Sequence, residues 1–502
     1  MNHDLLIYNA LDSVVTHECI APIWKDLHDS GNLPLYEFTE RLFDPLLYMV
    51  LRGIAVDMDE LEVTKRDTVK QIESAQLELC RLAGRELNPL SPKDCIKYFY
   101  IEKDIAPYTN RKTGKPTTDD LAMQRLAKGT ASRKGIPEAR LVQTLRGLHK
   151  LKGTYLEIEF DEDGRMRCSA NPRGTKTGRI STSKTIFGTG MNMQNLPEAF
   201  KRFLVADPGY VMIELDKSGA EWVVVAYLAN DANMIRVVEE GLDPHGYTAQ
   251  LMFKQPMELI TEENKLIGHS TNPDGIRALR DEYMPGLSNI PFLTRNMSMR
   301  QAAKKANHGL NYDEGYRTFA LMNDLLESDA KKIISLYHES YPGVRGVFHE
   351  YVKHQLSKDR TLTNSFGFKR KFLDAWNDSL FKAAYAQIPQ STVGQVVNWA
   401  LIKTYEDKDD AIQKAELLMQ VHDSILFQYP VEHIASLPRC LDKMYEYLNP
   451  TLRYSGRDFH IKTDAKIGYN WKDMTEFDGL SCTATSLRSL IDGLGQRTDK
   501  LA

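Results

Sequence analysis

Two aspartates stand out because each lies at the end of a strongly apolar, β-rich run. Asp216 follows residues 210–215, and Asp423 lies between residues 417–421 and 424–429. A buried carboxylate without a cationic partner is costly, so we expect a partner for each. Two carboxylates from separate strands can hold two Mg²⁺ ions about 3.5–4 Å apart, one activating a hydroxyl and the other stabilising a leaving phosphate oxygen. Taken singly, each also fits an ordinary strand-end or turn aspartate.

A second group of side chains that could do chemistry recurs at every fourth position of one segment. Arg300, Lys304, His308 and Tyr312 would form one slowly twisting stripe on a helix, with two cations followed by two rings. Like charges at this spacing disfavour a helix slightly, which indicates an anionic ligand such as phosphate, while the rings could stack on a base. An exposed basic helix without a ligand is the alternative.

The strands that must position the aspartates follow from the hydrophobic pattern. Strands are predicted over residues 156–160, 165–170, 210–215, 417–421 and 424–429. The first two are expected to form a hairpin, and the last two are expected to meet at a tight turn containing His422 and Asp423. Asp216 is therefore expected at the end of the strand over residues 210–215.

Helices are predicted over residues 38–51 and from about 60 to 83, the second ending at Gly84. The region from 230 to 350 is also expected to be mainly helical. The predicted fold class is therefore α+β and helix-rich. With 502 residues the chain has room for about three units with cores of their own.

Composition narrows the class of protein. Hydrophobic residues at 42% and charged residues at 26% are typical of soluble globular chains and exclude disordered and collagen-like classes. No apolar stretch is long enough to span a membrane and no basic signal region precedes one, so we expect a cytoplasmic protein without a membrane partner. The cysteines show no C-x-x-C pair and are expected to be buried thiols: Cys19, Cys80, Cys95, Cys168, Cys440 and Cys482.

Net charge is −4, which predicts no nucleic-acid binding by itself, but two segments are strongly basic. Residues 103–152 carry twelve Lys and Arg against four acids, and residues 165–202 carry eight against one. Each could follow a phosphate backbone, and a solvated basic surface is the alternative.

Six short motifs follow one another between about residues 35 and 475. They are Thr175-Lys-Thr177-Gly178-Arg179-Ile-Ser181 with Asn192-Met-Gln194-Asn195-Leu-Pro197, Asp216-Lys-Ser218-Gly-Ala-Glu221, Asp243-Pro-His245-x-x-Thr248-Ala249, Arg300-x-x-x-Lys304-x-x-x-His308-Gly309-x-x-Tyr312, Pro389-Gln390-Ser391-Thr392, and Val421-His422-Asp423. In this order, the chain resembles the family A DNA polymerases, the bacterial DNA polymerase I type with its phage relatives.

The resemblance implies a right-hand polymerase architecture with an antiparallel palm sheet, a helical thumb and helical fingers. It divides the chain into 1–34, a remnant resembling the end of an exonuclease domain; 35–155, the thumb and its palm-proximal helices; 156–250, the first part of the palm; 251–345, the fingers; 346–475, the second part of the palm; and 476–502, a C-terminal tail.

The resemblance also implies a DNA-directed DNA polymerase that adds dNTPs to a primer 3′-hydroxyl on template DNA by two-metal-ion catalysis. Asp216 and Asp423, with the backbone carbonyl of Lys217, would bind two Mg²⁺ ions, for which Mn²⁺ could substitute. Lys304 would donate a proton to pyrophosphate.

The remaining implied roles concern the nucleotide and the DNA. Arg300, Lys304 and His245 would hold the triphosphate, Glu221 would exclude a 2′-hydroxyl, and Tyr312 would guard the template-base position. His308 stands where the family has an aromatic ring that stacks on the nucleotide. Contacts to primer–template DNA are expected from Arg179, Asn195, Lys382, Gln390 and His422.

Six motif positions depart from the family pattern: Lys217, Gly219, Val223, His308, Asp313 and Ser424. Ser424 replaces an acid, which leaves one fewer carboxylate near the metals, and Asp313 replaces a glycine. We hypothesise that a protonated His308 tightens triphosphate binding at lower pH.

The first residues include Tyr8-Asn-Ala-Leu-Asp12, which resembles the end of a 3′–5′ exonuclease domain, although a chance Tyr/Asp pair in a helix is the alternative. We expect no proofreading from this chain, and a separate exonuclease or processivity subunit as a partner. A phage enzyme, located in the host cytoplasm, and a DNA-repair enzyme are equally compatible with the sequence.

Two other functions compete with this interpretation. A single-subunit RNA polymerase would share the two acids and the Arg/Lys helix, but Glu221 argues against it. A catalytically inactive nucleic-acid-binding subunit is disfavoured because both acids and both phosphate-binding cations are present.

Overall fold

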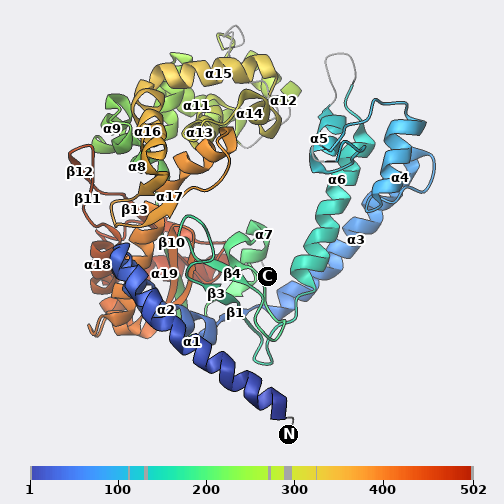
Figure 1. The fold of residues 1–502 in the computed structure, drawn as a ribbon. Helices are drawn as coiled ribbons and strands as arrows, with labels where there is room; N and C mark the ends of the chain where they lie inside the picture. The colour runs from blue at the N-terminus through green and yellow to red at the C-terminus, as the bar shows by residue number, and fades with distance from the viewer. Residues whose placement is uncertain are drawn as a thin grey trace.

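The computed structural model describes residues 3–110, 113–128, 134–268, 273–287, 297–323 and 325–498. These residues form a helical body built on one sheet, an arm of helices that stands apart from the body, and a long N-terminal helix that extends away from it (Figure 1). The predicted helix-rich α+β class is confirmed, and every strand pairing in the described chain is antiparallel. No helix in the described ranges is both long and apolar enough to cross a membrane.

The largest sheet has five strands in the order β14-β13-β6-β10-β9, and it is called the palm sheet because most of its strands lie in the segments predicted as palm. Its strands are β6 (Tyr210–Lys217), β9 (Glu416–Val421), β10 (Ser424–Pro430), β13 (Thr463–Gly468) and β14 (Thr475–Phe477). The strands predicted at 210–215, 417–421 and 424–429 are confirmed. Their long apolar runs fit a buried sheet, since β10 is buried along its whole length.

Helices cover the palm sheet and share a core with it. They are α2 (Leu33–Arg52), α17 (Asp378–Glu406), α18 (Leu437–Leu448) and α19 (Ala484–Thr498). Phe38 of α2 and Leu401 of α17 are buried with Val211 and Phe427 of the sheet. Two helix predictions are confirmed here and in the arm: α2 spans 38–51 and ends at Gly53, and α3 (Met58–Ala83) ends at Gly84 in the left-handed conformation.

The hairpin predicted from residues 156–160 and 165–170 is wrong. The first segment forms the end of a π-helical turn, Leu151–Leu156, and continues without strand structure. The second divides into β2 (Arg165–Met166), which pairs with β1 (Ile54–Val56), and β3 (Ser169–Asn171), which pairs with β4 (Ser181–Ser183). Long-range bonds explain the change, because Arg165 and Arg167 donate to backbone oxygens of residues 51–53.

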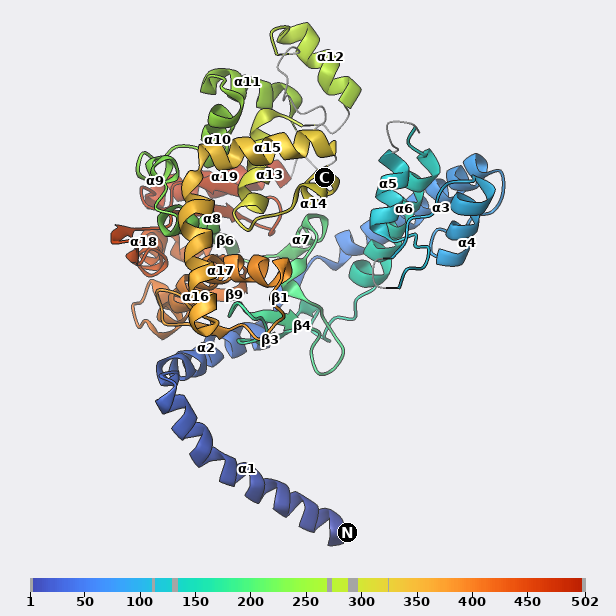
Figure 2. The ribbon, with the colours of Figure 1, turned by 45° about the horizontal axis from the view of Figure 1, so that its top comes forward.

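The arm consists of α3, α4 (Pro92–Ile96), α5 (Asp120–Lys128) and α6 (Pro137–Lys150), which lie within the segment 35–155 for which a thumb is predicted (Figure 2). It has a core of its own, including Leu79, Phe99, Met123, Val142 and Leu145. Part of its basic charge is structural: Lys103 pairs with Glu138 at 2.8 Å, and Arg146 donates to backbone oxygens of Pro89 and Thr118. Arg111, Lys112 and Arg133 of this basic segment lie outside the described residues.

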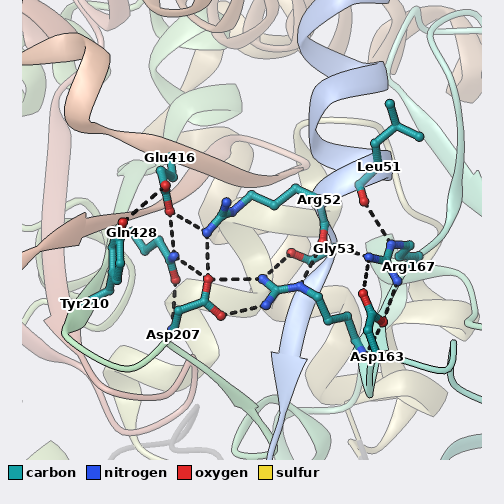
Figure 3. A network of polar contacts seen from close by, with 10 residues as sticks. Leu51, Arg52, Gly53, Asp163, Arg167, Asp207, Tyr210, Glu416 and Gln428 are labelled. Atoms are coloured by element: carbon teal, nitrogen blue, oxygen red, sulfur yellow. Dashed lines mark hydrogen bonds and ion pairs between the residues drawn. The ribbon is translucent and has the colours of Figure 1, made fainter.

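A polar network fixes the chain between α2 and the arm to the palm (Figure 3). Arg52, the last residue of α2, pairs with Asp207 at 2.7 Å and with Glu416 of β9. Gln428 of β10 donates to both of these carboxylates at 2.8 Å, and Arg165 pairs with Asp207 at 2.7 Å. Since every charge in this half-buried network has a partner, it anchors the base of the arm.

Nine helices of the described chain form the region that contains the predicted fingers: α8 (Ala220–Leu228), α9 (Ala232–Glu239), α10 (Pro244–Phe253), α11 (Met257–Ile267), α12 (Pro273–Tyr283), α13 (Met299–Leu310), α14 (Tyr316–Met322), α15 (Glu327–Ser340) and α16 (Glu350–Asp359). All of them except α12 contribute to one large hydrophobic core, which they share with the first half of α17. Helix α8 follows directly on the strand that carries Asp216, so the palm sheet and this helical region are joined at the predicted site.

The remaining α-helix and strands of the described chain are short. They are α7 (Glu198–Lys201), β5 (Leu204–Val205), β7 (Thr361–Thr363), β8 (Lys369–Lys371), β11 (Leu452–Tyr454) and β12 (Arg457–Phe459). At the N-terminus, α1 (His3–Asp29) extends away from the body (Figure 2), and its Trp24 ring contacts Tyr36 of α2. Large apolar side chains of α1 such as Leu11, Val15 and Ile23 are about half exposed.

Candidate active site

The structure brings the two predicted aspartates together at one end of the palm sheet. Asp216 lies near the end of β6, opposite Ser424 at the start of β10, and Asp423 immediately precedes Ser424. The backbone N–H of Lys217 donates to the backbone oxygen of Asp423 at 3.1 Å. Burial and the Asp423 carboxylate raise the pKa of Asp216 to about 7, and burial also raises the pKa of Asp423. Two partly buried carboxylates that repel each other form a site suited to cations.

The donor set fits a divalent cation with oxygen ligands. No ion pair in the described chain involves either carboxylate, although Arg179 lies close enough to lower the pKa of Asp423. No group of three or more His, Cys, Asp and Glu side chains arranged for a metal exists among the described residues, so the two aspartates would act with backbone oxygen and water. Carboxylate and carbonyl oxygens with water are the ligands that Mg²⁺ prefers.

The turn that carries Asp423 is held by two glutamines. His422 has a positive φ of 51°, and its backbone N–H donates to the side-chain oxygen of Gln194 at 3.0 Å. The amide of Gln194 donates to the backbone oxygen of Gln420 at 2.7 Å, and Gln420 donates to the backbone oxygen of His422 at 2.9 Å. Sequence reasoning assigned no role to Gln194, although its place inside a motif was a usable signal.

Lys217 and Ser424, two positions that depart from the family pattern, both make defined contacts. The Lys217 side chain is buried, with 1% of its surface exposed, and its ammonium lies among oxygens of Leu448, Asn449, Ile461 and Thr463. It therefore points away from the aspartates, so only its backbone could serve a metal. The Ser424 hydroxyl donates to the backbone oxygen of Val421 at 3.1 Å.

Helix α13 presents the predicted cations on one face. Its buried face includes Ala302, Ala303 and Ala306, whereas Lys304 and His308 are exposed and Arg300 is about a third exposed. Ser298 caps the helix, its hydroxyl accepting from the backbone N–H of Gln301 at 3.1 Å. Because the helix ends at Leu310, Tyr312 lies in the following turn rather than on the predicted helical stripe.

Arg300 has a bidentate partner that the sequence did not indicate. Its Nε donates to Asp243 Oδ2 at 2.6 Å, and its Nη2 donates to Asp243 Oδ1 at 3.0 Å. Asp243 also caps α10, accepting from the backbone N–H groups of His245 and Gly246. Burial raises the pKa of Asp243, but Arg300 and the backbone N–H groups of His245 and Gly246 together outweigh this, so the pKa is lowered overall.

His245 and His308 face each other across the gap between α10 and α13. Their ring centroids are 5.9 Å apart, and Nδ1 of His245 is 3.0 Å from the amide nitrogen of Asn307. Burial lowers the pKa of His245 to about 4, and burial together with Lys304 lowers the pKa of His308. Both shifts favour the neutral imidazole in the chain without nucleotide, and the hypothesis that a protonated His308 tightens triphosphate binding at lower pH stays a prediction.

Glu221 connects the aspartates to the end of α13. It lies in the first turn of α8, and its two carboxylate oxygens accept from the Arg179 guanidinium and from the Tyr312 hydroxyl. Arg179 in turn influences the pKa of Asp423. These contacts place the acids of the palm sheet, Glu221 and the rings of His308 and Tyr312 in one site.

The predicted DNA contacts lie around this site. Gln390 and Lys382 both belong to α17, and Asn195 is exposed at the end of a short 3₁₀ turn, Met193–Asn195. Lys382 lines a cavity of about 480 Å³ that Asp313 and Arg345 also line. Asp313, at a φ of 57°, pairs with Arg345 at 2.6 Å, which explains how this position tolerates a residue other than glycine.

The chain was compared with known proteins. The model of DNA polymerase family A matches residues 58–272 and 286–473. The thermostable DNA polymerase I of Thermus aquaticus is 24% identical over 487 residues, which cover 92% of this chain and 51% of that protein. DNA polymerase I of Geobacillus stearothermophilus is 25% identical over 460 residues, covering 88% of this chain and 46% of that protein. The chain thus spans about half the length of the curated relatives it matches.

A solved structure is also similar. It is the POL domain of Pol1 from M. smegmatis in complex with DNA primer-template and dNTP. The TM-score is 0.69 at 23% sequence identity, and the match covers 86% of this chain and 70% of that one. This likeness shows a shared fold.

Proposed function

The chain belongs to DNA polymerase family A, and we propose that it is a DNA-directed DNA polymerase, a nucleotidyltransferase that extends a primer 3′-hydroxyl on a DNA template. One observation carries the proposal: Asp216 and Asp423 converge at the end of two paired strands, and Glu221, in the first turn of the helix after Asp216, contacts Tyr312 in the turn that follows the cationic helix α13. The contacts of Glu221 with Arg179 and Tyr312 support this placement. Replication is the process that such an activity serves.

The aspartates and the backbone carbonyl of Lys217 would hold two Mg²⁺ ions, with Mn²⁺ as a substitute. When bound, such ions activate the primer hydroxyl and stabilise charge on the leaving oxygen. The chain's own part is to keep both carboxylates ionised at this end of the sheet. The raised pKa of Asp216 supports the idea that this residue needs a cation to do so near neutral pH.

Arg300, Lys304 and His245 would bind the triphosphate of the incoming dNTP. Arg300 offers a planar fork that matches phosphate, and Lys304 offers an exposed ammonium one turn further along α13. Lys304 would donate its proton to the departing pyrophosphate. The neutral ring of His308 would stack on the nucleotide, since its exposed position on the same helical face favours such contact.

Glu221 would act at the sugar and Tyr312 at the template-base position. The hydrogen bond between them keeps the carboxylate in place, where its bulk and charge oppose a 2′-hydroxyl. Arg179, Asn195, Lys382, Gln390 and His422 would contact primer–template DNA, and the arm, with its basic tips, would grip the duplex. In this proposal the arm would be the thumb, the five-stranded sheet would belong to the palm, and the helices around α13 would be the fingers.

Four finer points stay predictions. They are the phage origin, a role in DNA repair, the cytoplasmic location, and a separate exonuclease or processivity subunit. The half-exposed apolar side chains of α1 are the surface on which such a subunit should first be sought.

Primer extension with Mg²⁺ tests the proposal. A chain with this site should add dNTPs opposite a matched template and add rNTPs far more slowly. Equal use of rNTPs would favour the RNA polymerase alternative. A function that Asp423→Asn leaves intact would favour the inactive nucleic-acid-binding subunit.

A further inference from the structure

Helix α12 lies in sequence that the family model does not match. The two matched segments end at residue 272 and resume at residue 286, whereas α12 spans Pro273–Tyr283. The helix sits at the outer end of the predicted fingers, next to α11 (Figure 2). Ile276 and Arg280 are buried, while the Arg277 side chain is 82% exposed. An arginine that turns into a protein interior requires a specific partner there.

That partner is Glu263 of α11. The Nε of Arg280 donates to Oε1 of Glu263 at 2.9 Å, and Nη2 donates both to this oxygen and, at 2.9 Å, to the backbone oxygen of Met297. The side chains are 5% and 0% exposed, so the pair is buried on both sides. Removing one member would leave an uncompensated charge in the interior.

The second oxygen of Glu263 reaches α13. Oε2 accepts from the backbone N–H of Met299, the first residue of α13, at 2.7 Å. This N–H is one of those that a helix cannot satisfy internally, and a carboxylate at this end also complements the helix dipole. Next to it, Ser298 donates to Asn264 of α11 at 2.8 Å. The start of α13 is therefore fixed from α11 and α12.

We propose that Arg280 and Glu263 are positioning residues for nucleotide binding: together they fix the first turn of α13, from which Arg300 projects toward the triphosphate. This inference rests on the proposed function, because it assigns Arg300 to the triphosphate. Arg300 directly follows Met299, so a shift of the helix start moves its guanidinium first. Asp216 and Asp423 lie on the palm sheet, so the reaction step proposed for them should change less than nucleotide binding does.

The experiment uses the full chain and three variants. Arg280→Met removes the ion pair, Arg280→Lys keeps the charge, and Arg277→Met is the matched control on the exposed side of the same helix. Single-nucleotide primer extension gives KM and kcat for a dNTP, and amide hydrogen exchange of residues 297–303, without DNA or dNTP, reports the helix start independently of activity. If Arg280→Met does not fold, Glu263→Gln replaces it, because it keeps an oxygen for Met299 and removes the charge.

We expect Arg280→Met to raise the dNTP KM about tenfold with kcat changed less than about twofold. The reason is that a displaced Arg300 would bind the triphosphate more weakly in the ground state and in the transition state alike. In Arg280→Met, amide hydrogen exchange at residues 297–303 should accelerate by a similar factor. Arg280→Lys should recover part of the KM and of the exchange protection. Arg277→Met should match the wild type in both measurements. An unchanged KM, or a fall in kcat at constant KM, overturns the proposal, as does an equal effect of Arg277→Met. If the wild type adds no dNTP, the proposed function fails, and with it this inference, whatever the exchange shows.

Discussion

The ion pair between Arg300 and Asp243 must weaken before Arg300 can bind a triphosphate. Asp243→Asn removes the carboxylate charge with almost no change in shape. Asparagine also caps a helix, so the hydrogen bonds to His245 and Gly246 at the start of α10 should persist. The substitution therefore isolates the electrostatic competition between Asp243 and the nucleotide.

The pair is about one-third exposed on both sides, at 31% and 37%. Pairs of this kind contribute about 0.2–1 kcal/mol, which corresponds to about 1.4- to 5-fold in a binding constant. Asp243→Asn also removes a negative charge beside the proposed triphosphate site, and this too should strengthen dNTP binding. The dNTP KM of Asp243→Asn should thus fall by up to about fivefold at low salt with kcat unchanged, and the effect should shrink as salt screens the charges.

Steady-state single-nucleotide extension at two salt concentrations measures this effect. Asp243→Ala is the control, since it removes both charge and cap and should lower the thermal unfolding temperature, which Asp243→Asn should not do. A KM that stays the same or rises at low salt in Asp243→Asn would refute the reasoning, because it would show that Arg300 does not exchange Asp243 for the nucleotide.

Three further predictions follow from the contacts. Glu221→Ala should raise the rNTP-to-dNTP ratio of kcat/KM about tenfold or more, and an unchanged ratio would exclude Glu221 as the sugar gate. Lys217→Met should lower the free energy of unfolding in urea by about 2–6 kcal/mol, since the carbonyls of Leu448 and Ile461 lose their donor at about 1–3 kcal/mol each; wild-type stability would contradict this. Burial lowers the pKa of the His338 side chain to about 3 in the folded chain, whereas the unfolded chain protonates this side chain below about pH 6.5. The free energy of unfolding should therefore decrease as the pH is lowered. His338 should account for about 2 kcal/mol lost between pH 7 and 5, and a His338→Gln variant that loses stability as steeply as the wild type would contradict it.

The strands that carry Asp216 and Asp423 could be predicted because their signal is local. Continuous apolar runs end at Asp216 and Asp423, and such runs specify buried strands without knowledge of their neighbours. The helical stripe of α13 could be predicted for the same reason. Its end could not, because the turn at Tyr312 depends on a hydrogen bond to Glu221, which is distant in sequence.

Contacts between distant segments were beyond the sequence. The hairpin expected from residues 156–170 failed because arginine side chains in it bond to residues 51–53, so the strands pair elsewhere. Asp243 was part of a motif, yet nothing in its spacing indicated Arg300 as its partner. The burial of Lys217 follows from oxygens contributed by residues 448–463, and a lysine after an apolar strand carries no local sign of this.

The most direct test of the central claim is Mg²⁺-dependent primer extension by the wild type, Asp216→Asn and Asp423→Asn, with the exposed acid variant Asp458→Asn as control. If both aspartates hold the catalytic ions, each substitution should lower kcat by about 10³-fold or more, Asp458→Asn should leave it unchanged, and EDTA should stop the wild-type reaction. Extension by either aspartate variant at the wild-type rate would contradict the account.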